Sequence, residues 1–329
     1  MPIISVVVLT YNSERYIKRC LRSLERQSLG DFEVIVVDAG STDGTRDIVA
    51  QFDPRFIWLE LPKSDMGAAR NHGMRNSHGR YIMFLDSDDF YLEDKLRLQV
   101  DELNANVAVD VTYCAAWHFR TAHPEQIGRK RNSLQPVKFK DFFAGRNHNL
   151  NTMCIRRSVW DAGFAFGEGS RGRYGEEWRL QLSMARQGVA MSYIAEPLVV
   201  SEMRPDSHTI WSRQWIMKQE AISELEHTAT LLNDEQRSTI DVTAVIDEFR
   251  SKLVVALLLD TQKSEAGRIA RMIQDRRLAR KSMLLTQISR VLPGKLLASL
   301  LRSLWLWRQD RSFVWQATLA GIRDAMRLI

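Results

Sequence analysis

The sequence predicts an α/β protein, in which an open, mostly parallel sheet flanked by helices is followed by a helical C-terminal extension. Three apolar runs, at 4–10, 32–38 and 80–86, are separated by segments of helical periodicity that include 13–27 and 66–76. This alternation is typical of βαβ units, whose strands are parallel and buried on both faces. Beyond about residue 211 helical patterns dominate. We therefore expect two domains, residues 1–210 and residues 211–329.

The composition is that of an ordinary globular protein, with 45% hydrophobic and 26% charged residues in a chain of 329. The three cysteines lie far apart and have no zinc or CxxC spacing, which indicates a reducing compartment. The N-terminus lacks the basic segment of a signal peptide, and no stretch of about 18 uncharged apolar residues is present. The expected location is cytoplasmic.

Polar side chains follow all three predicted strands at the point where each strand ends. In open α/β sheets, ligands bind beyond the carboxyl ends of the strands, so these side chains are expected to meet at one ligand-binding edge. A solvated turn could explain the polar residues at any one strand end, but it does not account for their presence at all three. The residues concerned are Thr10, Tyr11 and Asn12 after the first strand, Asp38 after the second, and Asp86, Ser87, Asp88 and Asp89 after the third.

The carboxylates of Asp86, Asp88 and Asp89 would repel one another unless a positive charge lies among them. The simpler alternative is a helix N-terminus, where acidic residues are favoured. No GxxxxGK[ST] loop is present, and the GxGxxG of residues 167–172 follows no convincing strand, so neither offers a phosphate cradle. A divalent cation, Mg²⁺ or Mn²⁺, held by Asp86 and Asp88 would bind a diphosphate instead.

Three segments together resemble the GT-A glycosyltransferases of family 2. They are VVVLTYNSERYIKRCLRSLERQS, FEVIVVDAGSTDGT and GAARNHGMRNSHGRYIMFLDSDD, and a weaker match continues through MCIRRSVWDAGFAF and YGEEWRLQLSMARQG to about residue 200. The resemblance implies a Rossmann-like GT-A fold and an inverting transfer from a nucleotide-diphosphate sugar to a hydroxyl. The expected acceptor is a glycan of the cell surface, free or lipid-linked.

The resemblance also implies roles for individual residues. Thr10, Tyr11, Asn12, Asp38, Arg70, Asp86 and Ser87 would bind the donor. Asp88 would be the direct metal ligand, with Asp86 nearer the ribose. Glu177 would be the catalytic base, and Glu176 would bind backbone or an acceptor hydroxyl. Asp206 and His208 follow in the sequence and are further candidates for a metal ligand.

Two departures from the family pattern widen the choice of donor and base. The family usually has a second acidic residue after Asp38, where this chain has Ala39. A UDP donor is the commonest in the family, but GDP and dTDP donors stay open here. Glu176-Glu177 replaces the usual Glu-Asp, which leaves the register of the base open. The chain also lacks the QxxRW motif of processive synthases.

The C-terminal region is strongly basic. The net charge is +6, yet residues 268–329 contain thirteen Arg or Lys against three Asp. Leu296, Leu297, Leu300, Leu301, Leu304 and Trp305 share one face of a predicted helix. Basic amphipathic helices of this kind lie on anionic membranes, so we expect a peripheral protein on the inner face of the cell membrane. An ordinary core helix is the alternative, and nucleic acid is not an expected partner.

Two other functions compete with glycosyl transfer. A non-catalytic protein that binds nucleotide sugars or acts in assembly at the membrane would fit the departures at Ala39 and Glu177. A metal-dependent nucleotidyltransferase would also have acidic strand ends, but it would need a glycine-rich basic loop after the first strand. TYNSERY, residues 10–16, is not such a loop.

Overall fold

The structure, a computed structural model, describes residues 1–62, 64–121, 123–130, 138–169, 175–204, 214–260, 262–291, 296, 297, 299, 301 and 313–317. The chain divides into two compact units, and each is described by itself. The first comprises residues 1–138, 146–204 and 314–329, and the second comprises residues 139–145 and 205–313. The expected domain boundary at residue 210 lies outside the described residues.

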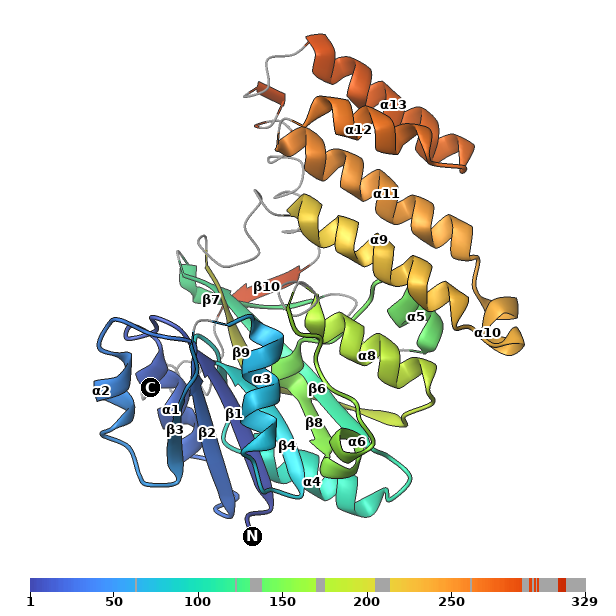
Figure 1. The fold of residues 1–329 in the computed structure, drawn as a ribbon. Helices are drawn as coiled ribbons and strands as arrows, with labels where there is room; N and C mark the ends of the chain where they lie inside the picture. The colour runs from blue at the N-terminus through green and yellow to red at the C-terminus, as the bar shows by residue number, and fades with distance from the viewer. Residues whose placement is uncertain are drawn as a thin grey trace. The chain divides into compact units, whose positions relative to one another are not determined.

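The first unit is built on one mixed sheet, and its N-terminal half is parallel (Figure 1). The strand order in this half is β3-β2-β1-β4, and every neighbouring pair is parallel. These strands are β1 (Ile4–Thr10), β2 (Phe32–Asp38), β3 (Phe56–Glu60) and β4 (Tyr81–Asp86). The three predicted strands are confirmed, whereas β3 is an additional edge strand.

The other half of the sheet departs from the parallel arrangement. β8 lies antiparallel to β4 and to β6, β7 lies antiparallel to β6, and β9 runs parallel to β6. β10 adjoins β7, and β5 pairs with β9. These strands are β5 (Phe90–Tyr91), β6 (Val111–Arg120), β7 (His123–Lys130), β8 (Met153–Arg156), β9 (Met191–Met203) and β10 (Phe313–Ala317).

Helices cover both faces of the sheet, because successive strand residues point to opposite sides. On one face Val6 and Val8 pack with residues of α1, α2 and α4, and on the other face Val7 packs with residues of α3, α6 and α8. The helices are α1 (Ile17–Glu25), α2 (Thr45–Val49), α3 (Met66–Arg75), α4 (Lys95–Ala105), α6 (Arg157–Asp161) and α8 (Glu176–Arg186), with a 3₁₀ turn, η1, at Leu150–Thr152. The helices expected at 13–27 and 66–76 are confirmed, the first in a shorter form.

The second unit is helical in its described part. α11 packs against α9, α12 and α13, and these four helices form a stack (Figure 1). The helices are α5 (Phe139–Phe143), α9 (Gln214–Thr230), α10 (Asp234–Thr239), α11 (Val242–Leu259), α12 (Lys263–Arg271) and α13 (Arg276–Val291). The helical C-terminal extension is confirmed. None of the helices in the described part of the chain combines the length and the apolar character that crossing a bilayer requires.

Candidate active site

The three predicted polar strand ends meet at one edge of the sheet. Thr10 of β1 is in register with Asp38 of β2, and Leu9 of β1 is in register with Asp86 of β4. Because these strands are parallel, Thr10, Asp38 and Asp86 end at the same rim. The Thr10 hydroxyl is buried and has no hydrogen-bond partner among the described residues. A buried, unpartnered polar atom at a rim of this kind is a candidate contact for a ligand.

Arg70 is the centre of a buried charge cluster at this rim. Its Nη2 lies 3.2 Å from Asp86 Oδ1 and 3.1 Å from Glu177 Oε1, and its Nη1 pairs with Glu176. α3 supplies the arginine, β4 supplies Asp86, and the first turn of α8 supplies both glutamates. The cluster therefore joins two chain segments that are about a hundred residues apart. These carboxylates raise the pKa of Arg70 despite its burial, so the guanidinium stays charged.

Exposure distinguishes the two glutamates. The Glu176 side chain is 3% exposed and the Glu177 side chain is 25% exposed, although both contact the same guanidinium. The pKa of Glu177 is raised to about 7, chiefly by burial, with Arg70 opposing the shift and Asp86 and Glu176 adding to it. A carboxyl with a pKa near 7 that solvent can reach suits a general base, because it can take up a proton at neutral pH. Glu176 is almost fully buried, and its contact with an acceptor hydroxyl stays a prediction.

Asp88 is held by a second arginine. Arg204, at the end of β9, places Nη2 at 2.8 Å from Asp88 Oδ2 and stacks its guanidinium over Tyr16 at 4.6 Å. Arg19 donates from Nη2 to the Asp88 backbone oxygen at 2.6 Å and pairs with Glu202 at 2.7 Å. Burial and Asp86 raise the pKa of Asp88, and Arg204 lowers it. Two arginines from distant parts of the sequence, Arg19 of α1 and Arg204 after β9, thus hold the loop after β4.

Asp89, the third carboxylate of the stretch, has a structural role. Its Oδ2 accepts from Asn151 Nδ2 at 2.6 Å and from Ser201 Oγ at 2.7 Å, and its Oδ1 accepts from the Glu202 backbone N–H at 3.0 Å. Burial and the neighbouring Asp88 raise the pKa of Asp89 well above its usual range. These bonds join the end of β4 to η1 and to β9. Asp89 is therefore not an acidic residue of a helix N-terminus, which was the simpler alternative for this stretch.

The loops after β1 and β2 are joined to each other by hydrogen bonds. Asn12, which adopts a left-handed conformation with φ of 47°, accepts from the Thr42 backbone N–H at 2.8 Å. Its own backbone N–H donates to Ser41 Oγ at 2.8 Å. Asp38 Oδ2 accepts from the Gly40 and Ser41 backbone N–H groups at 3.2 and 2.9 Å. Asp38 therefore shapes its own loop, and donor binding by Asp38 stays a prediction.

The remaining predicted residues fall into three groups. Ser87 is buried and shares a 2.8 Å hydrogen bond with Ser13, and Tyr11 is exposed at the rim. Arg70, expected against the nucleotide, lies instead among carboxylates, and its contact with a nucleotide stays a prediction. Asp206 and His208, together with Gly172 of the GxGxxG, lie outside the described residues.

Asp86 and Asp88 fit a divalent cation by their chemistry. Both are carboxylates at the rim and partly exposed, and hard cations often use one or two carboxylates and complete their coordination with water and substrate phosphates. Within the described residues no group of three His, Cys, Asp or Glu side chains converges as a complete cage. A cation at Asp88 would replace the guanidinium of Arg204, which contacts Oδ2, or share the carboxylate with it.

Sequence reasoning missed Arg204 and Asn151 as parts of this site. Arg204 stands two residues before Asp206 in SEMRPDSH, but an arginine in a polar loop carries no signal that it will pair with a distant aspartate. Asn151 Nδ2 contacts both Asp86, at 3.3 Å, and Asp89. It reaches them because β8 lies antiparallel to β4, a pairing that periodicity does not predict.

A glycosyl transferase family 2 model matches residues 5–161. This part of the chain belongs to glycosyl transferase family 2. Over 105 residues it is 40% identical to TuaG of Bacillus subtilis (strain 168), provisionally named a teichuronic acid biosynthesis glycosyltransferase, covering 30% of this chain and 41% of TuaG. The chain spans between 17% and 41% of the length of the first curated relatives that it matches.

Two solved structures share the fold of nearly the whole chain. TarS 1-349 of S. aureus in complex with UDP-GlcNAc has a TM-score of 0.57 and 18% identity over 94% of this chain and 92% of that chain. The mannosyltransferase PcManGT from Pyrobaculum calidifontis in complex with GDP-Man and Mn²⁺ has a TM-score of 0.58 and 18% identity over 94% and 82%. The predicted GT-A fold is thus confirmed.

Proposed function

We propose that this family 2 protein transfers a sugar, with inversion, from a nucleotide-diphosphate sugar to a hydroxyl of a cell-surface glycan. The Arg70 cluster carries the proposal, because it places the acidic end of β4 beside a partly exposed carboxylate of α8. A displacement at the anomeric carbon needs both a base for the acceptor hydroxyl and a site for the departing diphosphate. This rim offers candidates for both.

Glu177 is the proposed base. As the acceptor oxygen attacks the anomeric carbon, its proton passes to a Glu177 carboxylate oxygen, and the bond from the sugar to the diphosphate breaks. A positioned carboxylate base contributes about 10²- to 10⁴-fold in rate. Arg70 orients Glu177 through the 3.1 Å contact, and Glu176 holds the other nitrogen of the guanidinium. Glu176 is thus proposed as a positioning residue.

The donor is proposed to bind along the rim formed by β1, β2 and β4. Thr10, Tyr11, Asn12, Asp38 and Ser87 are the proposed nucleotide contacts. Asp86 and Asp88 would hold a divalent cation, which when bound supplies positive charge to the leaving diphosphate. The relatives' complexes contain UDP-GlcNAc in one case and GDP-Man with Mn²⁺ in the other. Both donor classes therefore stay candidates.

The acceptor is proposed to be presented at a membrane, free or lipid-linked. The charge of residues 268–329 supports this proposal, because each Lys or Arg near an anionic surface adds about 1 kcal/mol of attraction. The amphipathic segment at 296–305, on which the sequence argument depended, lies largely outside the described residues. α13, which precedes it, is described and is basic.

Thermal unfolding of the purified protein tests donor binding. UDP, GDP, dTDP and CDP would each be added with and without Mn²⁺, because a ligand that binds only the folded state raises the Tm by mass action. We expect one nucleotide to stabilise the wild type in a metal-dependent manner and to lose this effect in Asp88→Ala. Asp101→Ala, an exposed α4 residue whose partner is Arg97, is the matched control and should behave as the wild type.

A Tm that no nucleotide raises would contradict the proposal and favour a non-catalytic assembly protein that binds no donor. A nucleotide that raises the Tm without any turnover of its sugar would favour a non-catalytic protein over a transferase, because such a protein could bind the donor and leave it intact. Turnover is therefore measured on the same samples by release of the nucleoside diphosphate.

A further inference from the structure

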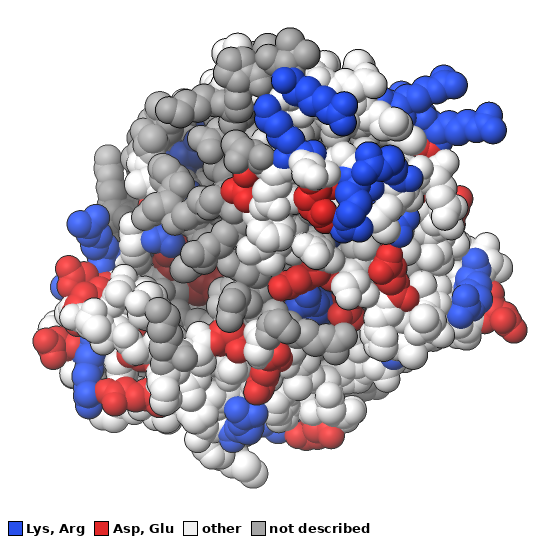
Figure 2. Space-filling view, turned by 45° about the horizontal axis from the view of Figure 1, so that its top comes forward, with Lys and Arg blue, Asp and Glu red and all other residues white. Residues whose placement is uncertain are grey.

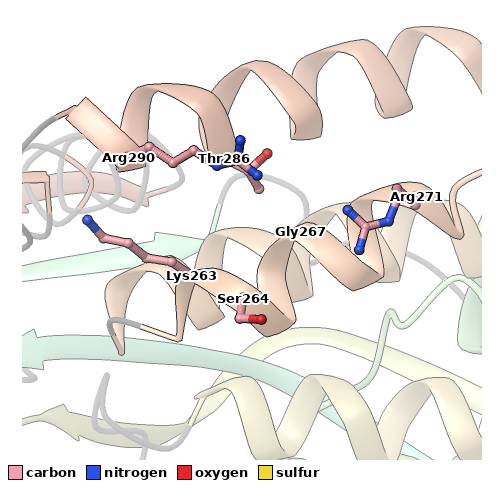
Figure 3. A pocket seen from close by; sticks show the side chains of 6 residues that line it. All are labelled: Lys263, Ser264, Gly267, Arg271, Thr286 and Arg290. Carbon is pink, nitrogen blue, oxygen red and sulfur yellow. The ribbon is translucent and has the colours of Figure 1, made fainter.

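The second unit contains a cleft that the proposed sugar transfer does not use. It lies between α12 and α13 and has a volume of about 290 Å³. Figure 3 shows the six residues that line it, Lys263, Ser264, Gly267 and Arg271 of α12 and Thr286 and Arg290 of α13. Three of these six residues are cationic and none is acidic.

The two arginines of the cleft, unlike the arginines near them, have no acidic side chain as a partner among the described residues. Arg268 pairs with Glu265 at 2.8 Å, and Arg250 lies 3.1 Å from both Glu226 and Asp247. In the described part of the chain, Arg271 and Arg290 have no acidic partner within ion-pair distance. Lys263 donates to the Ser289 backbone oxygen, which fixes its ammonium group beside α13. An anion in the cleft would supply the negative charge that Arg271 and Arg290 lack among the described residues.

Gly267 keeps the centre of the cleft open. A glycine in the middle of a helix costs about 1 kcal/mol relative to alanine, so its presence needs a reason. An added Cβ would meet only Arg271 Nη1, at 3.9 Å, and would otherwise project into open space. Packing against a neighbouring helix therefore does not require the glycine. A larger side chain at this position would fill the cleft without changing its charge.

The exposed face of α13 beside the cleft indicates where the anion comes from. Met283, Leu284 and Ile288 are 44%, 57% and 37% exposed. Besides Arg290 of the cleft, the same helix carries four more exposed cations, Arg276, Arg277, Arg280 and Lys281. Blue side chains gather over the last helices of the second unit in the space-filling view (Figure 2). Exposed apolar side chains interspersed with Arg and Lys are typical of helices that lie in the interface of an anionic membrane.

We propose that the cleft between α12 and α13 binds the phosphate of an anionic membrane lipid while the apolar side chains of α13 enter the bilayer surface. Arg271 and Arg290 bind the phosphate oxygens, and Lys263 adds a third positive charge. The inference deepens the proposed membrane contact and rests on it. It does not depend on sugar transfer, which is tested separately.

Co-sedimentation of the full-length protein with vesicles tests the cleft. One set of vesicles contains phosphatidylcholine alone and the other also contains phosphatidylglycerol. We expect binding only to the second set, and a loss of affinity of about tenfold or more in Arg271→Gln/Arg290→Gln. Gly267→Leu should weaken binding similarly with no change in charge. The matched control, Arg276→Gln/Arg277→Gln, removes two cations of α13 outside the cleft and should weaken binding less.

Circular dichroism and the nucleotide-induced Tm shift of each variant show whether it is folded and whether donor binding persists. Equal losses in the two double variants, together with full binding by Gly267→Leu, would show diffuse attraction and overturn the site. If calorimetry shows that the cleft binds inorganic phosphate but the protein does not bind phosphatidylglycerol vesicles, the cleft is a site for free phosphate, and the lipid proposal is overturned. Equal binding to both vesicle sets would show that binding does not require an anionic lipid, which would overturn the proposal.

Discussion

Glu177 is the residue on which the chemistry of the proposed reaction depends. Its position at the start of α8 would suit any acidic residue, since acids are favoured in the first turn of a helix. Its contact with Arg70, its partial exposure and its raised pKa set it apart from such a surface residue. Each of these depends on α3 and β4 as much as on α8.

The pKa of Glu177 predicts the pH dependence of the reaction. A general base must be deprotonated, and burial raises the pKa of this carboxyl to about 7. We therefore expect kcat/KM to be constant above about pH 7 and to fall about tenfold per pH unit below it. The measurement is a pH–rate profile at saturating metal. A midpoint of the profile near the usual glutamate pKa would show that burial does not raise the pKa of the catalytic base.

Arg204 is expected to oppose metal binding at Asp88. Its guanidinium lies 2.8 Å from the carboxylate that the proposed cation would use. Because a partly exposed ion pair is worth up to about 1 kcal/mol, Arg204→Gln should tighten Mn²⁺ binding by up to about fivefold. Electron paramagnetic resonance of free Mn²⁺ measures this without turnover. Arg55→Gln is the control, because Arg55 pairs with Asp53 just before β3, at the opposite end of the strands from the rim, and its loss should leave Mn²⁺ binding unchanged. Weaker Mn²⁺ binding in Arg204→Gln would contradict the expected competition between Arg204 and the cation.

At the scale of elements, the parallel strands were predictable and the pairings among later segments were not. The runs at 4–10, 32–38 and 80–86 are continuous and β-branched because both of their faces are buried. β3 is a five-residue edge strand whose middle is only partly buried, so its apolar pattern is weak. β8 has four residues, and its place between β4 and β6 depends on tertiary packing.

The same contrast applies to the candidate site. The acidic strand ends could be read from the sequence because each follows a recognisable strand. The partners of Asp88 and Asp89 could not, because Ser201 and Glu202 lie at the far end of β9 and Arg204 directly follows that strand. The helical pattern that dominates beyond about residue 211 likewise did not predict that the helices α9 and α10 end at Thr230 and Thr239.

Two helix glycines are expected to respond oppositely to substitution by alanine. A Cβ at Gly73 of α3 would lie 2.4 Å from Val7 Cγ1 of β1, whereas a Cβ at Gly267 of α12 has room. Gly73→Ala should therefore lower the free energy of unfolding by about 1–3 kcal/mol through overpacking. Gly267→Ala should raise it by about 0.5–1 kcal/mol through better helix propensity. Denaturant unfolding measures both, and the same sign in the two variants would contradict the packing argument.

At the scale of the whole molecule, the two proposed sites belong to different compact units. Substitutions without shared contacts usually have independent effects. We therefore expect Asp88→Ala to bind phosphatidylglycerol vesicles as the wild type does while losing metal-dependent nucleotide binding. Arg271→Gln/Arg290→Gln should show the reverse. Vesicle co-sedimentation and Tm shifts on the same two preparations measure this, and loss of both functions in either variant would contradict independent sites.

The central claim is that this rim transfers a sugar with Glu177 as the base. The most direct measurement is release of nucleoside diphosphate from UDP-, GDP- and dTDP-sugars, with water or a glycan as acceptor, by the wild type and Glu177→Gln. We predict turnover of one donor class and a loss of about 10²- to 10⁴-fold in Glu177→Gln, with donor binding retained. Undiminished turnover in Glu177→Gln would contradict the role of this residue, and a wild type that binds a donor without turning it over would contradict the enzyme.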